Sequence, residues 1–144
     1  MADIETIRGD SRKVIMPFFD ADLDEYRLVD NDQTQNPTVN DIDEIQYQVS
    51  DSPADETTHI TKDTNQIDII PADEVQLVSI QDAVSEGSIP ADAAVFTVRL
   101  TESDTQSLPA DALWHELQIK DINNNVSTIM RGDFEVIESA TNPN

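Results

Sequence analysis

The stretch Leu113-Trp-His-Glu-Leu-Gln-Ile-Lys120 decides the fold class, because residues suited to a protein core recur at every second position. Successive side chains of a β-strand point to opposite faces of the sheet. Leu113, His115, Leu117 and Ile119 therefore share one face, and the residues between them share the other. One apolar and one polar face are typical of an antiparallel strand that covers a core on one side.

The same alternation recurs over 44–49, 96–100 and 134–137, so several half-buried strands are expected. Residues 13–19 and 66–70 carry apolar residues on both faces, which favours more central strands. Pro17 has no N–H to donate, so its strand should lie at a sheet edge or carry a bulge. About seven short strands with turns between them predict an all-β fold, an antiparallel β-sandwich.

A repeated turn sets the spacing of the later strands. The tripeptide Pro-Ala-Asp occurs at 53–55, 71–73, 90–92 and 109–111. Proline presets a turn position and aspartate bonds its own backbone, so the tripeptide predicts a turn before a strand. Recurrent turn chemistry is favoured over an internal duplication, because the residues outside the tripeptide match poorly. Residues 74–86 carry a second possibility, a short helix in place of a strand.

The remaining segments complete one domain over 1–144, with a core from about 7 to 138. Residues 20–43 are polar and unpatterned, and we expect a long loop there. Residues 121–125 predict a hairpin turn, because asparagine tolerates positive φ. Residues 139–144 are expected to fray.

The charge balance limits the partners. The chain carries 30 acidic and 8 basic residues, a formal net charge of −22. Nucleic acid and anionic membranes are disfavoured as partners, because the long-range field repels both. At molar salt the Debye length falls to about 3 Å, so self-repulsion nearly vanishes. The composition resembles that of proteins from salt-accumulating halophiles, and we favour that interpretation over an ordinary acidic protein at low salt.

Several kinds of segment and site are missing from the sequence. There is no cysteine, so disulfides and thiolate chemistry are excluded. No apolar run is long enough for a transmembrane helix. The start Met1-Ala-Asp-Ile-Glu5 lacks the basic and apolar regions of a signal peptide, and we expect synthesis in the cytoplasm.

Asp20, Asp22 and Asp24 are the only metal candidates, because their alternation matches the oxygen ligands that open a calcium loop. That loop also needs glycine at its sixth position and glutamate at its twelfth, where this chain has Glu25 and Asn31. A second possible calcium loop, which begins at Asp121, also lacks the residues that such a loop needs. We therefore expect solvated acidic loops and no bound metal.

No catalytic set emerges from the sequence. His115 shares a face with leucines, which favours a packed, hydrogen-bonded histidine over a catalytic one; His59 is the other histidine. The chain has no Gly-x-Ser-x-Gly elbow and no glycine-rich phosphate loop. We expect no enzymatic activity and no cofactor.

Arg-Gly-Asp occurs at 8–10 and at 131–133. Glycine can supply a bend at a strand boundary, so the second copy is expected to separate a strand ending at Met130 from one beginning at Phe134. This interpretation is favoured over an adhesive peptide, because the tripeptide is common by chance.

Five segments together resemble a family of small immunoglobulin-like proteins of tailed viruses, which includes the N-terminal domain of the phage baseplate upper protein. The opening Ile7-Arg-Gly-Asp-Ser11 is similar to the start of that family. The closer likeness covers about 94–137, where the family has a strand, a Leu-Pro-Ala turn, an aromatic strand and a Gly-x-Phe-x-Val strand. The matching residues here are Phe96–Thr101, Asp104–Ala110, Leu113–Ile119 and Thr128–Val136.

The resemblance implies an immunoglobulin-like antiparallel sandwich with a long polar loop at 20–43. It also implies a non-enzymatic structural protein of a virus particle, and the acidity suggests a halophilic archaeal host. Its place would be a capsid decoration or turret, or a tail or baseplate adaptor. Its partners would be other virion proteins, arranged in a homo-oligomer or in multiple symmetric copies, with no nucleic acid and no membrane.

Two other functions remain open. An acidic mimic of DNA could inhibit a host nucleic-acid-binding protein, but the acids are spread over turns and several strand faces. A secreted adhesin would need an export signal, which the chain does not show.

Self-repulsion predicts that salt stabilises the chain. The thermal unfolding midpoint is expected to rise by several degrees between about 0.05 M and about 2 M KCl, because screening weakens repulsion among the carboxylates. Circular dichroism melting curves measure the midpoint. An unchanged or lower midpoint in concentrated KCl would contradict the salt-adaptation interpretation.

Overall fold

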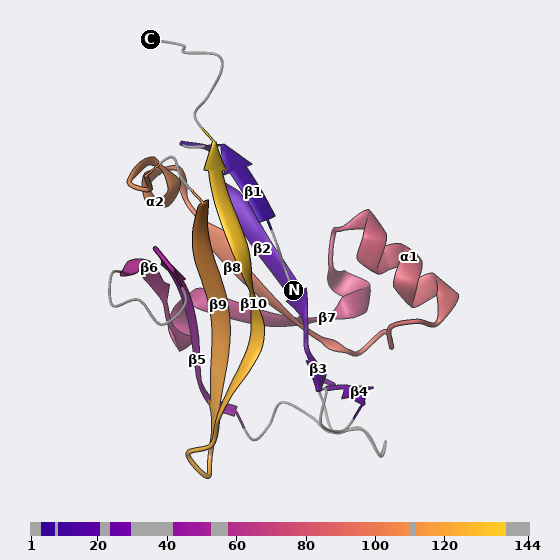
Figure 1. Ribbon diagram of the computed structural model, residues 1–144. Coiled ribbons are helices and arrows are strands. Elements are labelled where there is room, and N and C mark those ends of the chain that lie inside the picture. Colours follow the sequence, from indigo (N-terminus) through magenta and orange to yellow (C-terminus); the bar gives the residue numbers. More distant parts are fainter. Residues whose placement is uncertain are drawn as a thin grey trace.

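The computed structural model describes residues 4–7, 9–20, 24–29, 42–52, 58–109 and 112–137, which form two packed β-sheets (Figure 1). The larger sheet has the order β1-β10-β9-β5-β6, with the bounds Ile4–Ile7, Val126–Ile137, Ala112–Asp121, Ile42–Ser50 and Thr58–Lys62. The smaller sheet has the order β2-β8-β7, with the bounds Arg12–Pro17, Ala94–Leu100 and Ile67–Pro71. The expected all-β sandwich is confirmed.

Shorter elements connect and flank these sheets. A separate pair consists of β3 (Phe19–Asp20) and β4 (Glu25–Tyr26). The helical elements in the described part of the chain are η1 (Thr64–Gln66), η2 (Ala72–Glu74), α1 (Val78–Glu86) and α2 (Glu102–Gln106). Strand β1 runs parallel to β10, whereas the other pairings are antiparallel.

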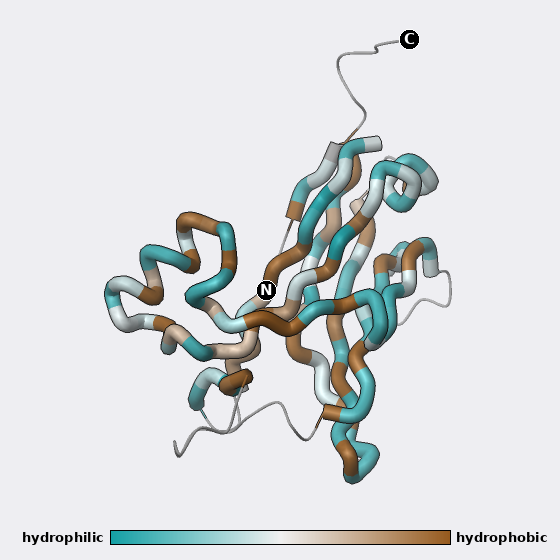
Figure 2. The backbone as a smooth tube through the Cα atoms, turned by 180° about the vertical axis from the view of Figure 1, so that it is seen from behind, coloured by the Kyte–Doolittle hydropathy of each residue, from teal (hydrophilic) through white to brown (hydrophobic). Residues whose placement is uncertain are grey.

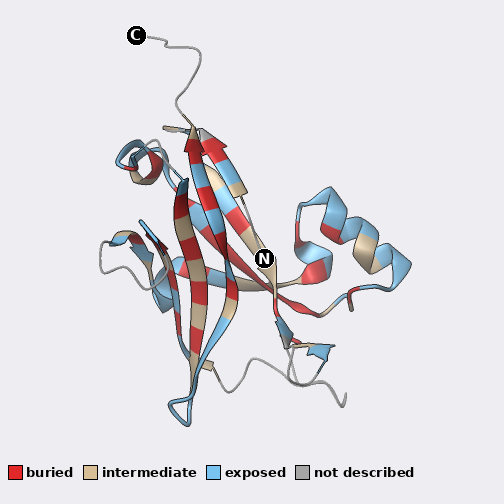
Figure 3. Ribbon diagram, in the orientation of Figure 1, coloured by how far each residue is buried: buried red, intermediate tan, exposed pale blue. Residues whose placement is uncertain are grey.

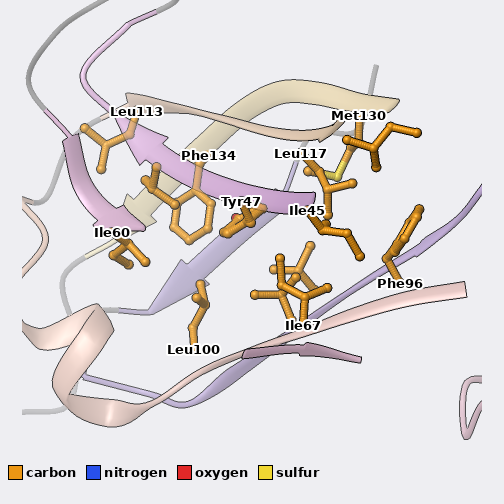
Figure 4. Close-up of a cluster of buried hydrophobic side chains, with 14 of the residues drawn as sticks. Ile45, Tyr47, Ile60, Ile67, Phe96, Leu100, Leu113, Leu117, Met130 and Phe134 are labelled. Atoms are coloured by element: carbon orange, nitrogen blue, oxygen red, sulfur yellow. The ribbon is translucent and has the colours of Figure 1, made fainter. Parts of the chain in front are cut away.

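The inner faces of the two sheets form the main core. Buried residues alternate with intermediate ones along β9 and with exposed ones along the second half of β10, as the bands in Figure 3 show. The same alternation appears as brown and teal along the strands seen from behind in Figure 2. Side chains from both sheets face one another in Figure 4, including Tyr47, Leu117 and Phe134 from one sheet and Ile67, Phe96 and Leu100 from the other.

The expectation that 13–19 and 66–70 form central strands is wrong. Strands β2 and β7 are the two edges of the smaller sheet, with β8 between them. Their second faces are apolar because a cover of α1, η2 and the 89–93 turn packs on the outside of this sheet. Ile15 and Ile70 pack against a second cluster of buried residues, in which Ala72, Val75, Ile80, Ile89 and Ala93 of the cover meet Val95 of β8. The placement of Pro17 at a sheet edge is confirmed.

The Pro-Ala-Asp copies lead into different elements. The copy at 90–92 forms a turn that leads into β8, as expected. The copy at 71–73 leads through η2 into α1, so the helical alternative for 74–86 is correct from Val78 onward. Helix α1 ends at Gly87, whose φ of 82° is the left-handed cap that glycine adopts most readily. The copy at 53–55 and residues 110–111 of the last copy lie outside the described residues.

Residues 126–137 form one continuous strand, so the expected break at the second Arg-Gly-Asp is wrong. Gly132 lies inside β10 and pairs with His115 of β9. The irregularity in pairing falls earlier, between Thr128 and Met130. The pairing of β10 with β9 therefore continues without a break at Gly132.

The expected loop over 20–43 is partly ordered structure. Its first part contributes β4, and Leu28 is buried and forms a bridge to Ala93. Apolar residues in this segment, which the polar composition obscured, attach it to the start of β8. Residues 30–41 and the tail expected to fray at 139–144 lie outside the described residues.

The passage from β1 to β2 carries the chain from one sheet to the other and requires glycine at position 9. Gly9 has a φ of 90°, and a Cβ there would lie 2.7 Å from Oε1 of Gln106. Its N–H donates to Oγ1 of the buried Thr105 in α2, and that hydroxyl donates to the carbonyl of Asp10. Helix α2 therefore holds the crossover in place.

Replacing Phe134 with alanine tests the core. Its ring is fully buried, so Phe134→Ala is expected to lower the free energy of unfolding by about 3–5 kcal/mol. Val126→Ala on the same strand, where the side chain is 62% exposed, should change it by less than about 0.5 kcal/mol. Urea denaturation measures both, and equal losses would contradict this assignment of the core.

Candidate functional site

The three aspartates considered as metal ligands do not form a described site. Asp24 is exposed in the turn between β3 and β4, with a φ of 55°. Asp22 and the side chain of Asp20 lie outside the described residues. Among the residues that the structure does describe, no group of three histidine, aspartate or glutamate side chains could hold a metal ion.

The hairpin turn predicted at 121–125 is confirmed, and it occupies the carboxylate of Asp121. That carboxylate accepts hydrogen bonds from the backbone N–H groups of Asn123 and Asn125, at 2.8 and 2.9 Å. These bonds, led by the one from Asn125, hold the pKa of Asp121 below its usual range. Asn124 adopts a φ of 67°, as the asparagine-rich turn predicts. Residues 121–125, the second possible calcium loop, therefore form a turn.

His115 is a packed core residue, as its place in the alternation predicts. Its side chain is fully buried, and Nδ1 lies 2.9 Å from the hydroxyl of Tyr47 on the neighbouring strand β5. Both Tyr47 and Phe134 meet the imidazole edge to face, with ring centroids 5.7 and 5.4 Å away. This hydrogen bond satisfies two polar atoms that the sandwich would otherwise bury at a cost.

Burial raises the pKa of Tyr47 far above its ordinary value, and the positive charge of Arg12 opposes that rise only in part. The phenol is therefore neutral at physiological pH and is no general base. The other histidine, His59, lies near the surface, where its Nε2 is 2.6 Å from a carboxylate oxygen of Asp51. The two histidines are in separate places and share no site.

The apolar tip of the β9–β10 hairpin and the groove beside it are the surface features that sequence reasoning missed. The tip projects beyond the sandwich (Figure 1) and carries two exposed apolar side chains, Ile122 at 67% and Val126 at 62%. Beside it lies a groove of about 490 Å³. The groove is lined by Glu44, Ile45, Gln46, Asp63, Thr64, Asn65, Gln118, Ile119, Lys120 and Val126. The available signal was Ile122, an apolar residue inside a polar turn.

No protein-family model matches the sequence, and no curated protein matches it. Within the described residues, no helix has the length and apolar character to cross a bilayer. Functional inference therefore depends on the geometry of the molecule and on the residues that resemble a viral family.

The buried tyrosine predicts a loss of stability in alkali. In the unfolded chain its phenol ionises near pH 10, but the raised pKa keeps it protonated in the folded state. The contribution of this group to the free energy of unfolding is therefore fully present below about pH 10, and it is lost as pH rises further. Urea denaturation between about pH 8 and pH 11 should show this decline, and Tyr47→Phe should reduce it.

Tyr47→Phe is also expected to lower the free energy of unfolding at neutral pH by about 1–3 kcal/mol, because Nδ1 of His115 loses its hydroxyl partner. Tyr26→Phe, at a half-buried position away from this pair, serves as the control. The same alkaline decline in wild type and Tyr47→Phe would show that the buried phenol is not its cause.

Proposed function

We propose that this chain is a non-enzymatic structural protein of a tailed virus particle, which binds neighbouring virion proteins. Its sandwich would be of the immunoglobulin-like kind. Its place would be a capsid decoration or turret, or a tail or baseplate adaptor. We also propose a halophilic archaeal host, because the net charge of −22 resembles that of proteins from salt-accumulating halophiles.

The observation that supports this proposal most is the arrangement of the segments that resemble the viral family. They occupy β8, α2, β9 and β10, which are consecutive in the chain. Strands β9 and β10 pair along most of their length, and β8 is the central strand of the facing sheet. The aromatic residue of the Gly-x-Phe-x-Val strand, Phe134, is fully buried at the centre of the core. Family-like residues therefore lie at the positions that determine the sandwich.

The surface fits a module whose role is to bind neighbours in concentrated salt. Exposed acids lie on both sheets and in the turns, at positions such as Asp63, Asp68 and Glu135. At high ionic strength such carboxylates keep a surface hydrated while their mutual repulsion is screened. The described acids are thus not confined to one sheet or one turn, whereas a DNA mimic needs its carboxylates along one continuous face.

The projecting hairpin supplies an attachment point in this proposal. Ile122 and Val126 expose apolar area at the tip of a long two-stranded arm, and a groove lined by both polar and apolar side chains lies beside it. An apolar centre with a polar rim is the common anatomy of a protein interface. Burial of this tip in a neighbouring subunit would fix the module while its opposite end faces outward.

Mass spectrometry of purified particles tests the proposal. The chain is expected in intact virions, and after heads are separated from tails it should remain with one of the two fractions. Its absence from both fractions would refute the assignment. Potent inhibition of a DNA-binding enzyme by the purified chain would favour the mimic instead.

A hairpin variant tests the attachment point. Ile122→Asp is expected to reduce the amount of the chain in purified virions several-fold, because a carboxylate at the tip opposes apolar burial. Val78→Asp places the same charge on α1, where the side chain is 69% exposed, and should leave incorporation unchanged. Equal incorporation of both variants would show that the hairpin tip is not the contact.

A further inference from the structure

A basic recess interrupts the acidic surface at the start of β2. It has a volume of about 300 Å³ and is lined by Ser11, Arg12, Lys13 and Arg99. Three of the eight basic residues of the chain therefore gather in one place, in a protein that has 30 acids. The register of the sheet produces this gathering, because Arg12 and Lys13 lie in β2 and Arg99 lies in β8.

Lys13 and Arg99 are held directly opposite each other. They are cross-strand partners in the β2–β8 ladder, and both are exposed. Like charges in this relation destabilise a sheet. Among the described residues, no carboxylate forms an ion pair with either side chain, whereas Lys62 pairs with Asp104 at 2.9 Å and Lys120 with Glu44 at 3.6 Å. Within that part of the chain, the recess thus keeps two uncompensated positive charges.

Arg12 also lines the recess, but it directly precedes Lys13 in β2, and successive side chains of a strand point to opposite faces of the sheet. Its cross-strand partner is the buried Leu100, and its charge acts on the phenol of Tyr47. Its Nε is buried and has no hydrogen-bond acceptor in the part of the chain that the structure describes. The exposed charges of the recess are therefore those of Lys13 and Arg99.

We propose that this recess binds the carboxylates of an acidic segment of a partner polypeptide. Guanidinium groups present planar pairs of N–H donors that match a carboxylate, and a lysine ammonium adds a point charge. The recess lies at the lower end of the volume range of ligand sites, about 300–1,000 Å³, which suits one or two side-chain carboxylates.

A polypeptide fits the site better than a free small anion. The net charge of −22 repels free anions and acidic peptides alike at long range, so the preference depends on contacts made at short range, and a free anion makes these only inside the recess. A peptide can gain further contacts beside it, because β2 is an edge strand and pairs with β8 alone among the described strands. Main-chain groups on such an edge can pair with an extended peptide. The proposal does not depend on the viral assignment, because it is argued from the residues of this chain and is tested on the purified protein.

Fluorescence polarisation with a labelled hexaglutamate peptide tests the proposal, with a labelled hexaglutamine peptide as the neutral probe. Wild type is expected to bind hexaglutamate at least about tenfold more tightly than hexaglutamine, and the difference should shrink as KCl rises to about 1 M. The double variant Lys13→Gln/Arg99→Gln should lose at least about tenfold in affinity for hexaglutamate.

The matched control is Lys120→Gln/Arg131→Gln, which removes two positive charges from the other sheet. Both double variants have a formal net charge of −22 − 2 = −24. The control should bind hexaglutamate within about twofold of wild type. Circular dichroism checks that each variant is folded, and the single variant Arg99→Gln replaces the first double variant if that one unfolds.

Three results would overturn the proposal. The first is equal binding of the two peptides by wild type. The second is an equal loss of affinity in the two double variants, which would reduce the effect to net charge. The third is displacement of the labelled hexaglutamate by inorganic phosphate as effectively as by unlabelled hexaglutamate, which would assign the recess to a free anion.

Discussion

The apolar contact between the inner faces of the two sheets is the interaction on which the rest of this molecule depends. In a chain with a net charge of −22, repulsion among the surface charges destabilises the folded state. Burial of aliphatic and aromatic side chains between β9, β10 and β5 on one side and β8 on the other opposes that repulsion. The polar pair inside this contact, Tyr47 and His115, is tolerated because each satisfies the other.

The larger sheet could be predicted from the sequence because one of its faces is turned towards solvent and carries polar residues. Alternation along 113–120 identifies both the strand and its inner face, and it places His115 in the core. The hairpin at 121–125 was predictable from local chemistry alone, since an aspartate followed by asparagines supplies its own hydrogen bonds. Short-range patterns therefore gave the parts of the fold whose causes are short-range.

The errors have a common physical origin in contacts between segments far apart in the sequence. A strand with two apolar faces signals that both faces are covered, but it does not say whether the strand is central. Strands β2 and β7 are covered by α1 and its flanking turns and still lie at sheet edges. The basic recess was hidden for the same reason, because only the ladder register brings Lys13 opposite Arg99.

The core explains how the chain stays folded, and the surface has two irregular features, the apolar hairpin tip and the basic recess. These two features are the places where we propose that neighbours bind. The lysines are few and well placed for a direct test: Lys13 in the recess, Lys62 paired with Asp104, and Lys120 near the hairpin.

Carbodiimide coupling, which joins a lysine amine directly to a carboxylate in contact with it, should be applied to purified virus particles and followed by mass spectrometry. The account predicts that Lys13 is joined to an aspartate or glutamate of a neighbouring virion protein. It would be contradicted if the chain were absent from the particles, or if the only links recovered were the internal pairs of Lys62 with Asp104 and Lys120 with Glu44.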